Sequence, residues 1–369
     1  MKKIRSFFKF LGKIEALPVV AVLLIMIATF MITAPDVFLK YRIYMSILQT
    51  VTPPLILGLG LTFVITAGEI DLSFPAIVAL SGFVFAWGYQ NLDQDLGRAW
   101  ATWASFGLAL GAGAFAGFIN GVLIAKVGVP SIMATLAAQF FWYGATIEMA
   151  GGRTWRLKGI QEDQVWEVFV RRIYGIIPQQ GRAPIGVPTQ ALWALGLTIF
   201  LWFILNRHKF GESIMFIGDN ANVARVMGVN VVATKIRLFT MMGIIAAFAG
   251  LILTLQVGVS YPTQGEGMLL LVMAAVFIGG TSIAGGYGSI IGTFFGAFII
   301  ISLEPGIVAT KVSGYWVQLI EGLVLGASVT LHVIIGEHNI AAFSDRIRRW
   351  STPVRLVQPA SEKDSVHLP

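Results

Sequence analysis

Two carboxylates close together in the sequence, Glu69 and Asp71, have the clearest potential for chemistry in this chain. They lie in the segment 68–75, GEIDLSFP, which interrupts two apolar stretches. Ionisable groups inside a membrane protein can bind a coupling ion or line a solute path. Asp71, followed by Ser73, can equally cap the next helix, because its side-chain oxygens can accept hydrogen bonds from free backbone amides. We favour capping for Asp71 and keep pathway lining as the second interpretation.

A glycine-rich segment, 279–288, forms the second interruption, and five of its ten residues are glycine. Backbone in a bilayer must satisfy its own hydrogen bonds, so this break predicts a turn at the membrane boundary or a break that lines a cavity. Its hydroxyl side chains, Thr281 and Ser282, can line a solute path or satisfy backbone groups at the break. We slightly favour the second role. The candidate pathway residues are therefore Glu69, Asp71, Ser73, Thr281 and Ser282.

The chain carries no motif of a known catalytic or metal centre. It has no GxxxxGK[S/T] nucleotide loop, no HExxH pair and no GxSxG elbow, and it contains no cysteine. We therefore expect no catalytic residue, no metal site and no cofactor on this chain. Its net charge of +7 does not predict nucleic-acid binding, because the basic residues lie between apolar segments and at the ends. Such placement is typical of contact with membrane lipid.

The elements that must position these residues are membrane-spanning helices. Of 369 residues, 56% are hydrophobic and only 12% are charged, about half the charged fraction of a globular protein. The apolar segments predict an all-α polytopic membrane protein with about ten transmembrane helices. We expect a transmembrane domain over 17–335 with an outer insertion at 151–188 and an inner one at 206–237. The tails, 1–16 and 336–369, are predicted to be cytoplasmic from their basic residues.

Small residues at helical spacing predict where these helices pack closely. The expected contact glycines are Gly107, Gly111, Gly117, Gly121, Gly288, Gly292 and Gly296. The two halves hold equal numbers of predicted spans, and Gly68-Glu69 has a counterpart in Gly265-Glu266. A 5+5 inverted repeat with broken helices would explain both features, although a two-residue match also arises by chance. Within the outer insertion, apolar residues over 165–177 recur at helical spacing and predict an amphipathic helix.

Four segments in order resemble the ribose-type permeases of sugar ABC importers. They are GEIDLSFPAIVALSG (68–82), NGVLIAKVGVPSIMATLA (120–137), NRHKFGESIMFIGDNANVARVMGV (206–229), and GEG with AAVFIGGTSIAGGYGSIIGTFFGA (265–297). The resemblance implies a permease subunit of the bacterial inner membrane. It also implies cytoplasmic ABC ATPase subunits that bind ATP and Mg, a periplasmic solute-binding protein, and a second permease, identical or related.

By the same resemblance, the inner insertion holds the segment that couples the permease to its ATPase. Its residues are Gly218, Asp219, Asn220, Ala224, Arg225 and Gly228. The expected function is import of a sugar or related polar solute, with the solute itself left open. An ion-coupled secondary transporter that uses Glu69 and Asp71 as its coupling pair is the alternative.

Overall fold

The computed structural model describes residues 16–176 and 185–336. The predicted tails therefore lie outside the described residues except at Ala16 and Gly336, as do residues 177–184 of the outer insertion. The described chain is mainly helical, as predicted. Its α-helices are α2 (Leu17–Thr33), α3 (Pro35–Phe38), α4 (Tyr41–Thr66), α5 (Phe74–Asn91), α6 (Asp93–Leu96), α7 (Arg98–Val122), α8 (Ser131–Ala150), α9 (Gln164–Phe169), α10 (Thr189–Arg207), α11 (Lys209–Val226), α12 (Val231–Val257), α13 (Met268–Ile278), α14 (Ile290–Ala309) and α15 (Trp316–Gly336).

Short elements complete the described fold. A π-helical turn, Leu123–Val127, extends α7, and a 3-10 turn, Ile160–Glu162, precedes α9. Four two-residue strands form two antiparallel pairs. Strand β1 (Trp155–Arg156) pairs with β4 (Val259–Ser260), and β2 (Arg172–Ile173) pairs with β3 (Val187–Pro188). The first pair attaches the outer insertion to the end of α12.

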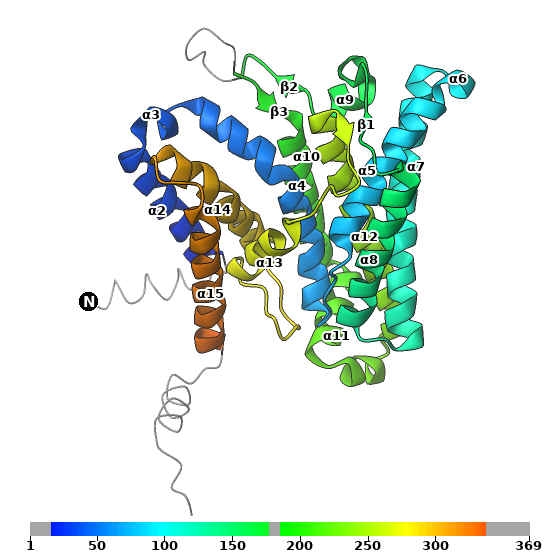
Figure 1. Cartoon of the computed structure of the whole chain (residues 1–369). Helices are drawn as coiled ribbons and strands as arrows, with labels where there is room; N and C mark the ends of the chain where they lie inside the picture. Colours follow the sequence, from blue (N-terminus) through cyan, green and yellow to red (C-terminus); the bar gives the residue numbers. More distant parts are fainter. Residues whose placement is uncertain (1–15, 177–184, 337–369) are drawn as a thin grey trace, which may run out of the picture.

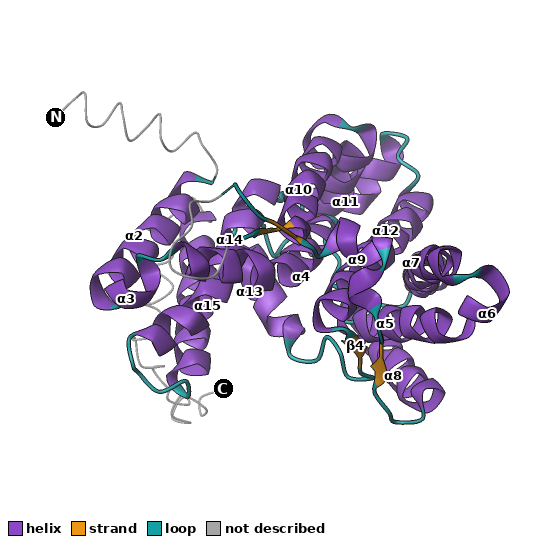
Figure 2. Ribbon diagram, turned by 90° about the horizontal axis from the view of Figure 1, so that it is seen from above, coloured by secondary structure: helices purple, strands orange, loops and turns teal. Residues whose placement is uncertain are grey.

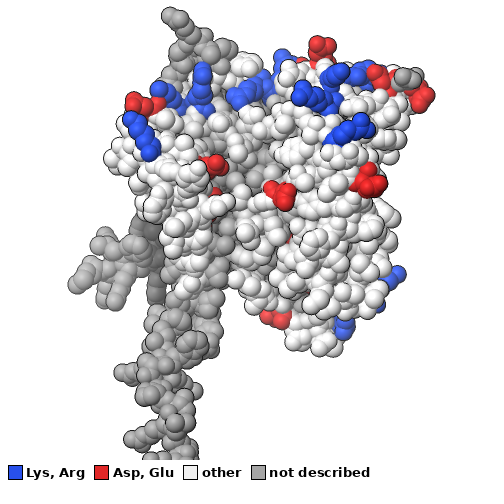
Figure 3. All heavy atoms as spheres, in the orientation of Figure 1, with Lys and Arg blue, Asp and Glu red and all other residues white. Residues whose placement is uncertain are grey.

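Five helices in the described ranges are long and apolar enough to cross a membrane. They are Tyr41–Thr66, Arg98–Val127, Thr189–Arg207, Val231–Val257 and Ile290–Ala309. Figure 3 shows charged groups mostly at the upper edge and lower end of one face. A wide band of mostly uncharged residues, which includes a few acidic groups, separates them. This distribution is that of a polytopic helical membrane protein.

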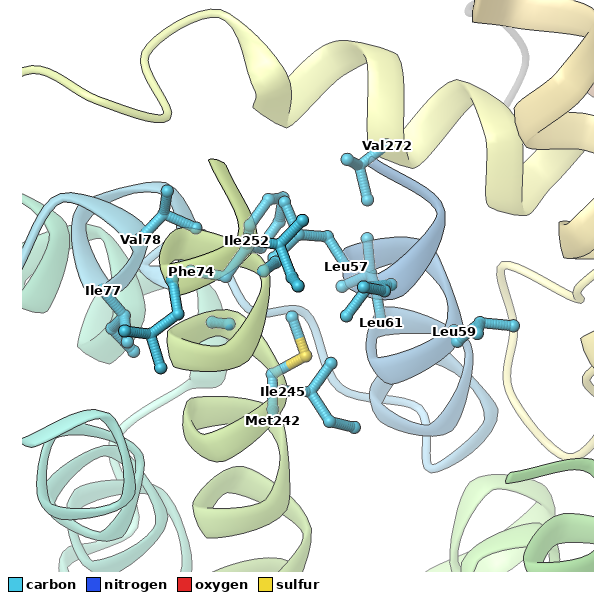
Figure 4. Close-up of a cluster of buried hydrophobic side chains, with 14 of the residues drawn as sticks. Leu57, Leu59, Leu61, Phe74, Ile77, Val78, Met242, Ile245, Ile252 and Val272 are labelled. Atoms are coloured by element: carbon cyan, nitrogen blue, oxygen red, sulfur yellow. The ribbon is translucent and has the colours of Figure 1, made fainter. Parts of the chain in front are cut away.

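The core is built around α4 and α12. Every residue of α4 from Val51 to Thr66 is buried, and this helix contacts α12, α13 and α14. Figure 4 shows Leu57 and Leu61 of α4 near apolar side chains of α12 and α13, with those of α5 beyond α12. Seen from above in Figure 2, α5, α7 and α8 lie on one side of this centre, and α2, α3 and α15 lie on the other.

The two ends of the bundle carry different elements. In Figure 1, α11 lies at the lower end, whereas α6, α9, β2 and β3 lie at the upper end. The inner and outer insertions are therefore at opposite ends. The predicted amphipathic helix is correct only in part, because α9 ends at Phe169 and the chain then enters strand β2. Pairing with β3 satisfies the backbone there and replaces the expected helical turns.

The close contact between α7 and α12 uses only part of the predicted glycine set. A Cβ at Gly117 would overlap the Phe239 carbonyl oxygen, and one at Gly121 would crowd the backbone of Ile236. Gly107 and Gly111 have nothing within 4 Å of the same position, so their prediction is wrong within this chain. The contact face instead continues to Gly113, four residues before Gly117, because residues four apart share a helix face.

In α14, the predicted glycines lie against α13. A Cβ at Gly292 would overlap the Gly279 carbonyl oxygen, and one at Gly296 would overlap that of Ala275. Gly288 precedes the helix and lies against the Thr66 side chain.

Candidate functional site

Three segments far apart in the sequence meet in a glycine junction, formed by Gly68, Gly218, Gly285 and Gly286. Gly68 follows α4, Gly218 lies in α11, and the last two belong to the loop 279–289. The Gly286 amide donates a hydrogen bond to the Thr66 carbonyl (2.9 Å). A Cβ at Gly218 would overlap that same carbonyl oxygen, so the backbones approach as closely as glycine allows.

The backbone conformation of the junction also favours glycine. Gly68 has φ 73°, Gly285 has φ 85° and Gly286 has φ 76°, all in the left-handed region. A Cβ at Gly285 would lie 2.8 Å from the Gly218 carbonyl oxygen and 3.0 Å from the Gly68 backbone. The junction therefore ties α11 directly to α4 and to the loop that precedes α14.

The helix α11 is divided into two parts at Asn220. This residue has φ −159° and ψ 105°, which interrupts the helix, and its Oδ1 accepts hydrogen bonds from the amides of Asn222 (3.0 Å) and Val223 (3.2 Å). Asn220 thus caps a short second helix. Ala224 on this helix is buried against Ile217 and Val231.

The outer surface of this short helix is exposed. Of the predicted coupling residues, Asp219, Asn220, Arg225 and Gly228 are exposed, and Gly228, at φ 87°, forms the turn toward α12. Three exposed apolar side chains lie among them that were not predicted: Val223, Val226 and Met227. Val226 is 90% exposed. Their i, i+3, i+4 spacing was visible in the sequence and is the pattern of a helix that docks into a groove.

The candidate carboxylate Glu69 is neutralised by an ion pair. Its Oε1 contacts Lys235 Nζ of α12, with side chains only 12% and 19% exposed. The pair links the segment after α4 to the start of α12, beside the glycine junction. A carboxylate held in this way is not free to bind a coupling ion without first losing its partner.

The other carboxylate, Asp71, is fully buried in the turn that begins α5. The amide and hydroxyl of Ser73 both donate to Asp71 Oδ1 at 2.7 Å, and Asn120 of α7 donates to Ser73 Oγ at 2.7 Å. Asp71 therefore closes a turn just before α5, and no side chain caps the helix itself, so the predicted helix cap is not confirmed. The opposite oxygen, Oδ2, has no hydrogen-bond partner within the described part of the chain.

The remaining two predicted pathway residues hold the loop 279–289. The Thr281 hydroxyl accepts from the Ser289 amide (3.3 Å), and Ser289 in turn caps α14 through Gly292 (3.0 Å). The Ser282 amide donates to the Tyr287 carbonyl (3.0 Å). The predicted pathway residues therefore lie in two separate places. Asp71 and Ser73 belong to a turn that contacts α7, and Thr281 and Ser282 belong to the loop before α14.

Two neighbouring cavities lie between α4, α12, α13, α14 and α15. One has a volume of about 470 Å³ and the other about 970 Å³. They share the side chains of Met268, Leu271, Ile300, Glu304 and Glu321. Their walls are mainly apolar, with Glu304 and Glu321 as charged groups common to both. None of the five predicted pathway residues lines these two cavities.

Five long apolar helices joined by buried contacts are the features of a multi-pass helical membrane protein. The chain belongs to the family described as branched-chain amino acid transport system / permease component, whose sequence profile matches residues 43–329. This membership confirms a permease component, as the resemblance implied.

Curated relatives are transport permeases by name. The ribose import permease protein of Escherichia coli strain K12 is 32% identical over 305 residues, which cover 82% of this chain and 89% of that protein. The xylose transport system permease protein of the same strain is 28% identical and covers 85% and 90%. The fructose import permease protein of Rhizobium meliloti is 30% identical and covers 86% and 84%. No solved structure matches the chain.

Proposed function

We propose that this chain is the permease subunit of a binding-protein-dependent ABC importer of the bacterial inner membrane. It moves a monosaccharide or a related polar solute with ATP hydrolysed, in the presence of Mg, by a separate subunit. The observation that carries the proposal is the backbone contact of α11 with α4 and the loop 279–289. The names of the relatives support a sugar as the solute class.

The short second helix of α11 is the proposed dock for the ATPase. Its exposed apolar residues Val223, Val226 and Met227 fill a groove, and Arg225 contributes charge at the rim. Force on this helix reaches the membrane helices through the glycine junction. The outer insertion, at the opposite end, contacts the solute-binding protein, and a second permease, identical or related, completes the pathway.

Ten spans follow if α2, α4, α5, α7, α8, α10, α12, α13, α14 and α15 each carry the chain across the membrane. At about 1.5 Å per residue, α13 is too short to cross alone. The loop 279–289 completes that crossing, because its tip reaches α11. An even number of spans places both termini on the same side of the membrane, and their basic residues favour the cytoplasmic side.

A 5+5 inverted repeat fits this order of helices. Both α4 and α12 are long central helices followed by a link and a shorter helix, α5 or α13. Each link contains a glycine in the left-handed region, Gly68 or Gly265, and a fully buried polar side chain, Asp71 or Gln264. These matched features support the repeat.

The alternative, an ion-coupled secondary transporter, is less well supported. Its proposed coupling pair would be Glu69 and Asp71, but Glu69 is held by Lys235 and Asp71 by Ser73.

ATP-driven uptake by the reconstituted complex distinguishes the two functions. We expect uptake of labelled ribose, xylose or fructose to require ATP and to survive an uncoupler. Uptake by this chain alone, abolished by the uncoupler, would contradict the importer.

A further inference from the structure

A third cavity lies where the outer insertion meets the membrane helices. It has a volume of about 390 Å³, within the range of roughly 300–1,000 Å³ common for small-molecule sites. Its lining includes Gln49 of α4, Gln256 of α12, Trp166 of α9, and Arg172 and Tyr174 at β2. Elements distant in the sequence therefore build one concave surface at the end of the bundle opposite α11.

A hydrogen-bond network fixes the polar side of this cavity. The Arg172 guanidinium donates to Gln49 Oε1. Gln190, fully buried at the start of α10, donates through Nε2 to the Gln49 carbonyl (2.6 Å) and to Gln256 Oε1 (3.0 Å). The network connects α4, α10, α12 and strand β2, so the side chains that line the cavity are held before a solute arrives.

The chemistry of the lining fits a neutral solute with many hydroxyl groups. Amide groups both donate and accept, and the guanidinium presents a planar fork of donors, so each can bond neighbouring hydroxyls of a sugar. Gln256 accepts from Gln190 through Oε1, which leaves its Nε2 directed to other acceptors. The indole of Trp166 offers an apolar face for the C–H side of a sugar ring. The lining contains no carboxylate and includes a second arginine, Arg171, which disfavours a cationic solute. The charge of Arg171 is balanced by its ion pair with Glu167.

The position of Gln256 connects this cavity to the membrane interior. The same side chain lines the 470 Å³ cavity between α4, α12, α13 and α14. A solute bonded to Gln256 in the outer cavity therefore contacts a side chain that also lines the 470 Å³ cavity. Gln190 holds the Gln256 side chain through a hydrogen bond to its Oε1. A solute that bonds to Gln256 Nε2 leaves this bond intact.

We propose that Gln49, Gln256, Arg172 and Trp166 form an outer receiving site for a monosaccharide-like solute, from which Gln256 passes it to the cavity between the membrane helices. The site rests on the proposed function, because it names where the imported solute first contacts this chain. Gln190 acts as a positioning residue for Gln256.

The absence of cysteine allows a direct test by solute protection. Single substitutions Gln256→Cys and Tyr174→Cys are made in the full chain, in complex with its co-purified partners, and labelled with a membrane-impermeant thiol reagent. We expect ribose, xylose or fructose at high concentration to slow labelling several-fold at both positions. Gln164→Cys, on the exposed start of α9 outside the cavity, is the matched control and keeps its rate. Salt of equal osmolarity controls for non-specific effects.

Adding Gln190→Leu to Tyr174→Cys tests the positioning residue. It should weaken the protection while the chain keeps its elution profile. The site is wrong if no sugar slows labelling at either cysteine, or if the Gln164→Cys control slows equally. ATP-driven uptake by the wild-type complex is measured in parallel. Uptake without protection overturns the receiving site alone, whereas absent uptake of all three sugars overturns the assignment of a monosaccharide as the solute in the proposed function.

Discussion

Gly218 is the residue at which the backbone of α11 comes closest to that of α4. Replacing it with alanine places a methyl group on the Thr66 carbonyl oxygen and beside the Gly286 amide. Neither backbone group can turn away freely. We expect Gly218→Ala to lower stability by about 1–3 kcal/mol, as overpacking does, and to reduce ATP-driven uptake. Thermal unfolding of the solubilised chain and uptake by the complex measure the two effects.

Gly107→Ala is the matched control for Gly218→Ala, because Gly107 is exposed with open space around it. Alanine in a helix interior gains roughly 0.5–1 kcal/mol over glycine, so this variant should keep or raise stability and keep uptake. Equal behaviour of the two variants would show that the junction has room for a side chain.

The ion pair between Glu69 and Lys235 gives a second prediction at the residue scale. Glu69→Gln leaves a mostly buried ammonium without its carboxylate, so we expect stability to fall by about 1.5–3 kcal/mol. The exchanged pair, Glu69→Lys with Lys235→Glu, should recover part of the loss. Unfolding curves of the single and double variants test this. A double variant no better than the worse single variant would argue against a direct pair.

At this scale the sequence identifies groups but not their partners. Glu69 and Asp71 stand out because carboxylates are rare in apolar sequence. Lys235 lies 166 positions from Glu69, and no local pattern connects them. A contact between Asp71 and Ser73 could be anticipated because only two positions separate them, although it closes a turn before α5 and does not cap the helix. The contact with Asn120, which depends on tertiary packing, could not.

The kink in α11 gives a prediction at the scale of one element. Asn220→Ala removes the side-chain oxygen that accepts from the Asn222 and Val223 amides, so the second helix should lose about 1 kcal/mol of local stability. We expect faster hydrogen exchange over 221–226 and weaker association with the ATPase. Asn220→Asp, which keeps an acceptor, should remain close to wild type. Unchanged exchange in Asn220→Ala would mean that tertiary contacts alone hold this helix.

Element boundaries could be predicted where apolar runs were long. The central helices α4 and α12 are continuous, because an uninterrupted apolar segment in a bilayer satisfies its backbone as helix. The start of α12 at Val231 nevertheless lies inside the predicted inner insertion, 206–237. The face that α7 presents was predicted less well, since small residues occur on more than one side of it. Gly117 and Gly121 face α12, while Gly107 and Gly111 do not, a difference set by the register of the partner helix. The outer insertion was hardest, because strand pairing decides its structure.

On the scale of the whole molecule, the proposed sites of solute entry, passage and ATPase docking lie at different depths. The receiving site lies beside the outer insertion, the cavities lie between the central helices, and α11 lies at the other end (Figure 1). Composition and the four family segments predicted a membrane permease. They could not predict the meeting of Gly68, Gly218 and Gly285, because closing such a junction depends on the packing of the entire bundle.

The central claim is that an ATPase docks on α11, and co-purification tests it most directly. The tagged chain is extracted from its native membrane in mild detergent, and bound proteins are identified by mass spectrometry. The variants are Arg225→Glu on the exposed α11 surface and Arg153→Glu at the opposite end, both exposed in this chain. We predict that an ATPase with a nucleotide-binding loop accompanies the wild type and Arg153→Glu and is lost from Arg225→Glu. Equal retention by both variants would refute the docking surface, and no ATPase with the folded wild type would contradict the importer.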